Sequence, residues 1–198
     1  MSHLWIGITG GIGSGKSAIT AYLRERGEYV ICADEVAREV VQPGEKGADA
    51  VRAAFGDEYF LPDGTMDRAK LAQYVFENPE RVKRLNAILH PIIINAVWER
   101  ASHVRGRVFI DAPLLIESGM HEKTDYLWVV TADREMRLSR VIVRDETTRE
   151  AVEKRMESQM EDSQRISVAD EVIDNSGSLF ELHKQIDRLL KKGEYNEV

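Results

Sequence analysis

Residues 10–17 read GGIGSGKS and follow directly on the apolar run LWIGIT at residues 4–9. The octapeptide matches G-x-x-x-x-G-K-[ST], the pattern of a phosphate-binding loop, which lies between a strand and a helix. Its glycines allow positive φ and let backbone N–H groups approach an anion closely. The stretch therefore predicts a strand, a phosphate-binding loop and a helix that begins near Lys16.

Each polar group of this loop has an expected role toward a nucleoside triphosphate such as ATP. The Lys16 ammonium would reach the β- and γ-phosphates, the Ser17 hydroxyl would bind Mg²⁺, and the helix N-terminus would face the β-phosphate. The alternative is a glycine-rich turn that binds nothing. The residues expected at the nucleotide are Gly11, Ile12, Gly13, Ser14, Gly15, Lys16, Ser17 and Ala18.

Composition limits the remaining possibilities. A chain of 198 residues with 43% hydrophobic content suits one domain, residues 1–198, with subdomains inserted in its loops. We expect a cytoplasmic protein, because the chain shows neither a cationic leader with an apolar segment nor a run approaching the ~20 apolar residues of a membrane span. A net charge of −7 argues against a nucleic-acid-coating surface. The single cysteine, Cys32, excludes an intrachain disulfide and is expected to be a small buried residue. No obligate protein partner is evident.

Short apolar runs alternate with helical segments, which predicts an α/β fold with a five-stranded parallel sheet flanked by helices. Several of the runs are apolar throughout, as expected for strands covered on both faces. The expected strands are residues 4–9, 28–33, 107–111, 126–131 and 171–173.

A long, mostly helical stretch separates the second and third expected strands. It exceeds what one crossover requires, so residues 42–105 are expected to form an inserted subdomain that binds a second substrate, the acceptor. Pro91 lies inside the last of its helices and should kink or divide it. The expected helices are residues 34–41, 47–55, 67–76 and 79–103.

Two carboxylates lie where strands are expected to end, Asp34 after the second and Asp111 at the end of the third. Ligands of open parallel sheets bind at the carboxyl ends of strands. Phosphoryl transfer to an alcohol needs one carboxylate for the hydroxyl proton and another to support Mg²⁺. We therefore expect Asp34 to serve as base and Asp111 at the metal. A helix N-cap at Asp34 and a structural turn at Asp111 are the alternatives.

Arg137, Arg140 and Arg144 recur at helical spacing and share an arc of roughly 60°. Arginine forks stabilise the charge of a transferring phosphoryl group well, so residues 134–160 are expected to form a lid. On this hypothesis Arg140 contacts the phosphoryl group, whereas Arg137 lies on the surface and its replacement by alanine is almost silent. The alternative is a solvated face whose arginines pair with Glu135, Asp145 and Glu146.

Taken together, these segments resemble the dephospho-coenzyme A kinase family. The loop alone is generic, but A-D-x-x-A-R at residues 33–38, H-P at 90–91 and P-L-L-x-E at 113–117 occur in that family's order. The resemblance spans nearly the whole chain and includes Gln159, to which no role is assigned. It implies the fold of P-loop small-molecule kinases, with an acceptor subdomain and a lid. The implied reaction moves the ATP γ-phosphate to the ribose 3′-hydroxyl of dephospho-coenzyme A.

The resemblance also implies roles for individual residues. Asp34 would be the catalytic base, Lys16 and Arg140 would neutralise the transferring group, and Asn175 would lie beside the adenine. Arg38, His90 and Leu114 would belong to the acceptor side. Two positions depart from the family pattern: Cys32 replaces an aspartate two residues before the base, and Arg137 replaces a common glutamine.

Two other functions would also use a phosphate-binding loop. A guanine-nucleotide switch would need an N-K-x-D string, which is absent, and the D-x-x-G at residues 174–177 comes too late to sense a γ-phosphate. A P-loop kinase for another acceptor, such as a nucleoside monophosphate or a sugar acid, is compatible with the residue pattern, because pocket shape sets acceptor choice.

Overall fold

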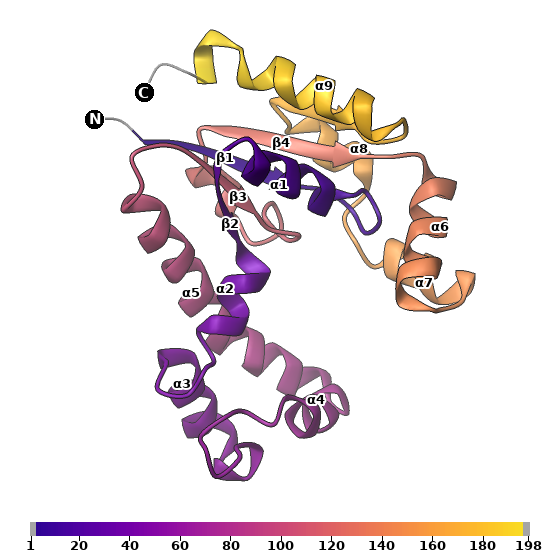
Figure 1. Ribbon diagram of the computed structural model, residues 1–198. Helices are drawn as coiled ribbons and strands as arrows, with labels where there is room; N and C mark the ends of the chain where they lie inside the picture. Colours follow the sequence, from indigo (N-terminus) through magenta and orange to yellow (C-terminus); the bar gives the residue numbers. More distant parts are fainter. Residues whose placement is uncertain (1–2, 196–198) are drawn as a thin grey trace. The chain divides into compact units, whose positions relative to one another are not determined.

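The computed structural model describes residues 3–195 and divides the chain into two compact units (Figure 1). The first, here called the core unit, comprises the chain up to Val30 and from Val104 onward. The second, the helical unit, is the continuous segment Ile31–His103. The helical unit is thus an insertion in the core unit, and each is described by itself below.

A five-stranded sheet organises the core unit, in the order β2-β3-β1-β4-β5. Strand β1 pairs in parallel with β3 and with β4, and β4 pairs in parallel with β5. In register, Ile8 of β1 faces Asp111 of β3, so the carboxyl ends of these two strands meet at one edge. All five expected strands are confirmed to within two residues: β1 His3–Thr9, β2 Tyr29–Cys32, β3 Gly106–Asp111, β4 Tyr126–Thr131 and β5 Glu171–Asp174.

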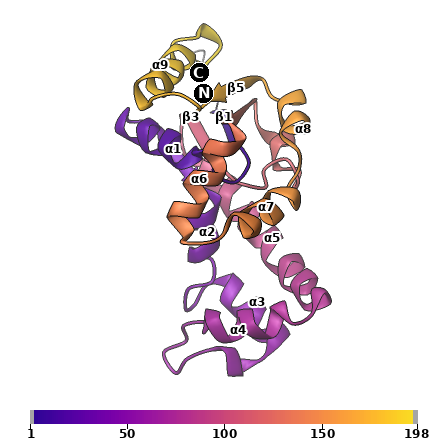
Figure 2. The ribbon, with the colours of Figure 1, turned by 90° about the vertical axis from the view of Figure 1, so that its right-hand side faces the viewer.

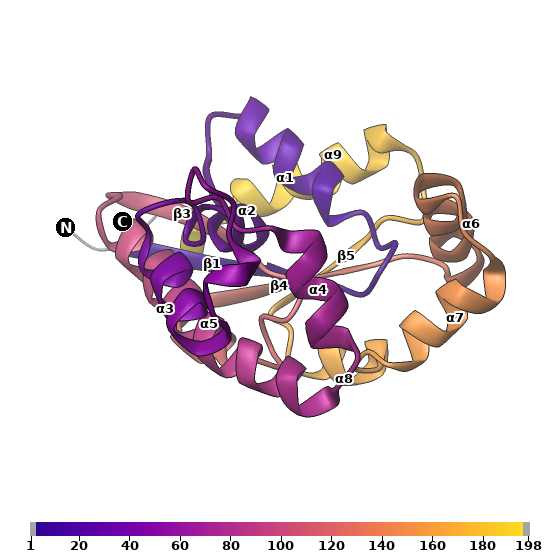
Figure 3. The ribbon, with the colours of Figure 1, turned by 90° about the horizontal axis from the view of Figure 1, so that it is seen from below.

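The central strands are buried, as their apolar runs predict. Ile6 and Ile8 of β1 and Trp128 of β4 have no exposed surface. Helices α1 (Lys16–Glu25) and α9 (Leu179–Leu190) are neighbours and pack their apolar sides into this core (Figure 3). From α1 the core takes Ile19 and Leu23, at the helical spacing that also leaves residues 24–26 exposed.

Three more helices of the core unit follow β4: α6 (Arg134–Asp145), α7 (Arg149–Glu157) and α8 (Asp162–Ser167). Helix α6 begins where it does because the Asp133 carboxylate accepts hydrogen bonds from two backbone N–H groups of its first turn, a cap worth about 1 kcal/mol. Helices α6 and α7 lie side by side and share a small apolar cluster (Figure 2). Ile12 of the glycine-rich loop packs against that cluster.

The helical unit contains four α-helices: α2 (Ala33–Glu39), α3 (Lys46–Phe55), α4 (Arg68–Phe76) and α5 (Pro79–Ser102). All four were expected from the sequence within two residues at each end. Helix α5 contacts the other three helices and is therefore the central helix of this unit. Asn78 caps α5 and Pro79 occupies its first turn, where a missing N–H costs nothing.

Helix α5 runs unbroken through Pro91, so the predicted division at that residue is wrong. A proline removes one hydrogen bond, and packing of a 24-residue helix against three neighbours outweighs that loss. A bend at Pro91 stays a prediction. Within residues 3–195 no helix combines the length and the apolar character needed to cross a bilayer.

Candidate active site

The glycine-rich loop leads from β1 into α1 in the way the sequence predicts. Gly15, the residue before the helix, has a left-handed φ of 89°. A Cβ at this position would lie 2.1 Å from Nδ2 of Asn175, so both the backbone angle and the close approach require glycine. The helix then starts at Lys16, with its first N–H groups at the loop.

The side chains of the loop form a set suited to phosphate. Lys16 is half-buried and its Nζ donates to the Gly10 carbonyl at 3.3 Å, which holds the ammonium over the loop. Ser17 is exposed at the first turn of α1. The Ser14 hydroxyl is buried and has no hydrogen-bond partner within the described residues. An ammonium, a hydroxyl and helix-terminal N–H groups are the donors that bind a polyphosphate.

Asn175, the residue after β5, supports this loop from below. It is only 5% exposed, and its amide Nδ2 donates to the Ser14 carbonyl at 2.8 Å. Its own backbone N–H donates to Thr131 at the end of β4. The sheet therefore fixes the loop through Asn175. The contact of Asn175 with adenine stays a prediction.

Arg140 reaches the same place from α6. Its guanidinium donates to the Asn175 carbonyl at 2.9 Å and lies 3.5 Å from the Gly13 carbonyl. It is half-buried and pairs with none of the acidic residues of the alternative interpretation. Arg140 thus places a positive charge directly beside the phosphate-binding loop.

Arg137 corrects the prediction made for it. The sequence hypothesis left this arginine on the surface, but it is 6% exposed. Its Nε donates to the Ile12 carbonyl at 2.9 Å, and its Nη1 forms an ion pair with Asp162 at the start of α8. The three arginines of α6 therefore do not form a uniformly charged surface, because Arg137, the first of them, points into the molecule toward the glycine-rich loop.

Arg144, one turn beyond Arg140, is exposed and pairs with Asp145. Hydrogen bonds from Arg144 and then from Arg155 of α7 hold the pKa of the Asp145 carboxyl well below its usual range. At the other end, Arg149 of α7 binds Glu135 of α6 and lowers the pKa of that carboxyl. Arg144 fits the surface-pair alternative, and these ion pairs join α6 to α7.

In the helical unit, Asp34 is not a helix cap. The N-cap of α2 is Cys32, and no side chain caps this helix. Asp34 lies in the first turn of α2, and its side chain is exposed. Arg38, one turn later, is also exposed. Cys32 is half-buried, where full burial was expected. An exposed carboxylate at a helix N-terminus is available for chemistry.

The helical unit also contains a cavity of about 230 Å³, partly open to solvent, between α2, α4 and α5. Its lining is mostly apolar, with Arg68 and Asn86 as polar members. Two residues that the resemblance assigns to the acceptor adjoin it in sequence: Arg38 follows the lining residue Ala37, and the exposed His90 follows the lining residue Leu89. Arg68 also donates to the Arg38 carbonyl at 3.1 Å.

Asp111 and Leu114 belong to the core unit. Asp111 ends β3, opposite Ile8, and is 8% exposed. Leu114, three residues later, is 49% exposed on a loop that Thr9 anchors through the Pro113 carbonyl. Residues 3–195 hold no cluster of three or more His, Cys, Asp or Glu side chains able to bind a metal ion. A Mg²⁺ site would accordingly combine one or two protein groups with phosphate oxygens, which is how Mg²⁺ commonly binds.

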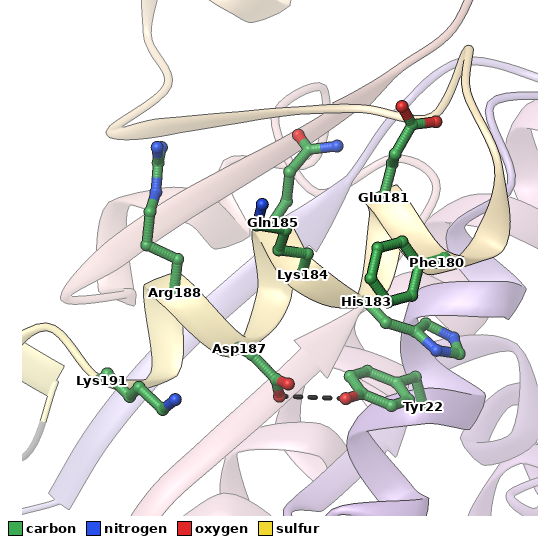
Figure 4. A pocket seen from close by; sticks show the side chains of 9 residues that line it. All are labelled: Tyr22, Phe180, Glu181, His183, Lys184, Gln185, Asp187, Arg188 and Lys191. Carbon is green, nitrogen blue, oxygen red and sulfur yellow. Dashed lines mark hydrogen bonds between the residues drawn. The ribbon is translucent and has the colours of Figure 1, made fainter.

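A groove of about 830 Å³ between α1 and α9 holds no predicted site residue (Figure 4). Tyr22 stacks on His183 with ring centroids 3.7 Å apart and donates its hydroxyl to Asp187. Burial, followed by the bond to Asp187, raises the pKa of Tyr22. These contacts hold α1 against α9, and we interpret the groove as part of helix packing.

Comparisons with known proteins point to one family over nearly the whole chain. The family model of dephospho-CoA kinase matches residues 4–181. A relative named dephospho-CoA kinase from Geobacter metallireducens is 44% identical over 193 residues, covering 96% of each chain. A relative of the same name from Fusobacterium nucleatum is 40% identical and covers 95% of this chain and 97% of its own length.

Solved structures show the same fold. The TT1252 protein of Thermus thermophilus superimposes with a TM-score of 0.82 at 34% identity, covering 98% of this chain and 99% of its own. Dephospho-CoA kinase from Campylobacter jejuni has a TM-score of 0.70 at 23% identity, covering 95% and 96%. Shikimate kinase from Acinetobacter baumannii, at 14% identity with a TM-score of 0.53, covers 100% and 96% and shares the fold alone.

Proposed function

Since this chain belongs to the dephospho-CoA kinase family, we propose that it transfers the γ-phosphoryl group of ATP to the ribose 3′-hydroxyl of dephospho-coenzyme A. The products are coenzyme A and ADP. The observation that carries the proposal is the phosphate-binding loop of the core unit, braced by Asn175 and flanked by Arg140. We propose the cytoplasm as its location, where ATP is supplied.

ATP and Mg²⁺ fit the groups that the loop presents. The backbone of residues 11–15 would cradle the phosphates, Lys16 would lie against the β- and γ-phosphates, and Ser17 would contribute its exposed hydroxyl to the metal. Asp111, at the carboxyl end of β3, is the second residue proposed at the metal. Bound Mg²⁺ supplies charge neutralisation at the phosphate oxygens.

The transfer itself needs a proton acceptor and fixed positive charge. We assign the first role to Asp34, whose exposed carboxylate would orient the acceptor hydroxyl and take its proton. Lys16 and Arg140 would stabilise the negative charge of the transferring group, since both lie at the loop before the reaction begins. The chain spanning residues 134–160 would act as the lid that carries Arg140.

The acceptor belongs to the helical unit in this proposal, within residues 42–105 together with α2. The apolar cavity suits an aliphatic part of the acceptor, with Arg68 and Asn86 available to polar groups. Arg38 and His90 adjoin its lining residues and, together with Leu114 of the core unit, are the proposed acceptor-binding residues.

A panel of acceptors tests the proposal. The native protein is incubated with MgATP and dephospho-coenzyme A, a nucleoside monophosphate, shikimate or gluconate, and each acceptor is weighed by mass spectrometry. Dephospho-coenzyme A alone should gain one phosphate, and Lys16→Ala should lose that activity. Phosphorylation of another acceptor at a higher rate would refute the proposed substrate. Slow ATP hydrolysis with no acceptor modified would favour a nucleotide switch.

A further inference from the structure

A network of charged side chains connects three segments around the phosphate-binding loop. Arg137 on α6 pairs with Asp162, the first residue of α8. The other oxygen of Asp162 accepts from Arg165 at 3.2 Å, and Arg165 also pairs with Glu117 at 3.2 Å. Glu117 lies on the loop that follows β3. The two arginines of this network are buried, with side chains only 7% exposed for Arg137 and 2% exposed for Arg165.

The network reaches the backbone of the glycine-rich loop at the two peptide groups of Ile12. The Ile12 carbonyl accepts from Nε of Arg137 at 2.9 Å, and its N–H donates to Oε1 of Gln159 at 2.9 Å. Both peptide groups of Ile12 are thus held by side chains far along the chain. Arg137 also approaches the residue before Ile12 closely, because a Cβ on Gly11 would lie 2.3 Å from Nη2 of Arg137.

The geometry of Arg137 can be met only by an arginine. The planar guanidinium donates in two fixed directions, from Nε to the loop and from Nη1 to the carboxylate. A lysine could keep the charge beside Asp162 but has one donor centre on a flexible stem. Without its carboxylate, a buried guanidinium is drawn toward water, so the contact with Ile12 depends on Asp162 as well.

We propose that Arg137 and Asp162 are positioning residues that fix the loop at Ile12 in the conformation that binds ATP. The proposal rests on the nucleotide site assigned above. Arg137 contacts the loop backbone, which holds the phosphates equally before and during transfer. Its loss should therefore weaken ATP binding and leave the chemical step little changed.

The test compares Arg137→Met and Arg137→Lys with the native protein. For both variants the KM for ATP and the Kd of a non-hydrolysable ATP analogue should rise about tenfold, the effect of one lost charged hydrogen bond, while kcat stays within about threefold. Arg137→Lys should keep its thermal midpoint near the native value, since it retains a charge for Asp162. Arg134→Met is the matched control, because Arg134 lies on the same helix but is exposed, and its KM should not change.

A double-variant cycle tests the dependence on Asp162. Asp162→Ala should raise the Kd of the ATP analogue at least as much as Arg137→Met, because it removes the ion pair with Arg165 as well as the one with Arg137. The double variant should be no worse than Asp162→Ala alone, because the contact between Arg137 and Asp162 is already broken in that variant. Additive losses would show that the two residues act separately and would overturn the coupled role.

A purely structural role predicts a different pattern. It would lower the thermal midpoint of Arg137→Met and leave the analogue Kd of both Arg137 variants within twofold of native, which would overturn the proposal. If Arg137→Met fails to fold, Arg137→Lys decides alone. Binding of the ATP analogue needs no acceptor, so an incorrect acceptor assignment would appear in the panel experiment and leave this measurement intact.

Discussion

Arg137, Arg140 and Arg144 share one helix and one spacing, yet each has different surroundings. Arg137 is buried against the loop, Arg140 is half-buried beside it, and Arg144 is exposed with Asp145. Sequence spacing fixes which residues share a side of a helix but not what that side faces. The ion-pair partner of the buried Arg137 is Asp162, 25 residues away, and nothing in the sequence marks that pair.

Arg140→Ala tests the arginine nearest the expected γ-phosphate. Turnover should fall by at least about 100-fold, as when a preorganised charge at the transition state is removed. The thermal midpoint should change little, because within residues 3–195 the side chain makes only two hydrogen bonds, both to backbone carbonyls. Steady-state kinetics with calorimetric melting measures both quantities. An equal loss in the exposed control Arg134→Ala would show that disturbance of α6, not the charge, is responsible.

Asp34→Asn tests the proposed base. The kcat should fall by roughly two to four orders of magnitude, the usual contribution of a positioned proton acceptor, while the Kd for ATP stays nearly native. Glu35→Gln, the next carboxylate on α2, is the control and should keep most of its activity. If Asp34→Asn retains more than about a tenth of native turnover, the carboxylate is not the base.

The residues proposed to bind phosphate were predictable because the chemistry of such a site requires a local sequence pattern. The loop, the start of α1 at Lys16 and the need for glycine at Gly15 follow from eight consecutive residues. Asn175 and Gln159 were marked only by the family resemblance, and their bonds to Ser14 and Ile12 required the fold. Asp162 and Arg165 were missed, since long-range ion pairs leave no periodic signal.

At the scale of helices and strands, apolar runs and the helical segments between them located all five strands and the helices of the insertion. Pro43 and Gly44 lie in the turn between α2 and α3, where both residue types disfavour a helix. The absence of a division at Pro91 has a tertiary cause. A local rule predicts where a helix is weakened, whereas packing of α5 against α2, α3 and α4 decides whether it continues.

The α6–α7 pair should loosen in acid. Because the Asp145 carboxyl has a lowered pKa in the folded protein, its ion pairs stabilise the fold above the ordinary carboxyl pKa of about 4 and are lost as pH falls below it. Melting of the native protein and Asp145→Asn from pH 6 to about pH 2.5 should show a native advantage that shrinks below about pH 4. An advantage that persists unchanged at the acid end would contradict an origin in this carboxylate.

At the scale of the whole molecule, two compact units invite separate tests of donor and acceptor. Ala72→Phe should fill part of the 230 Å³ cavity of the helical unit. The KM for dephospho-coenzyme A should rise about tenfold with the KM for ATP within twofold, since only one substrate loses its binding space. Gln73→Phe places the same ring on the exposed neighbour and should leave both values native. A higher KM for ATP alone would contradict the acceptor role of the cavity.

The tryptophans are distributed so that intrinsic fluorescence can report on the two units separately. Of the three in the chain, Trp98 alone lies in residues 31–103, on α5, whereas Trp5 and Trp128 belong to β1 and β4. Trp128 is fully buried, with the Tyr195 ring edge-on at 5.7 Å. A Trp98→Phe chain would emit from the core unit only, and the difference from native emission would be the spectrum of the helical unit. Each unit thus has a tryptophan emission of its own, from Trp98 in the helical unit and from Trp5 and Trp128 in the core unit.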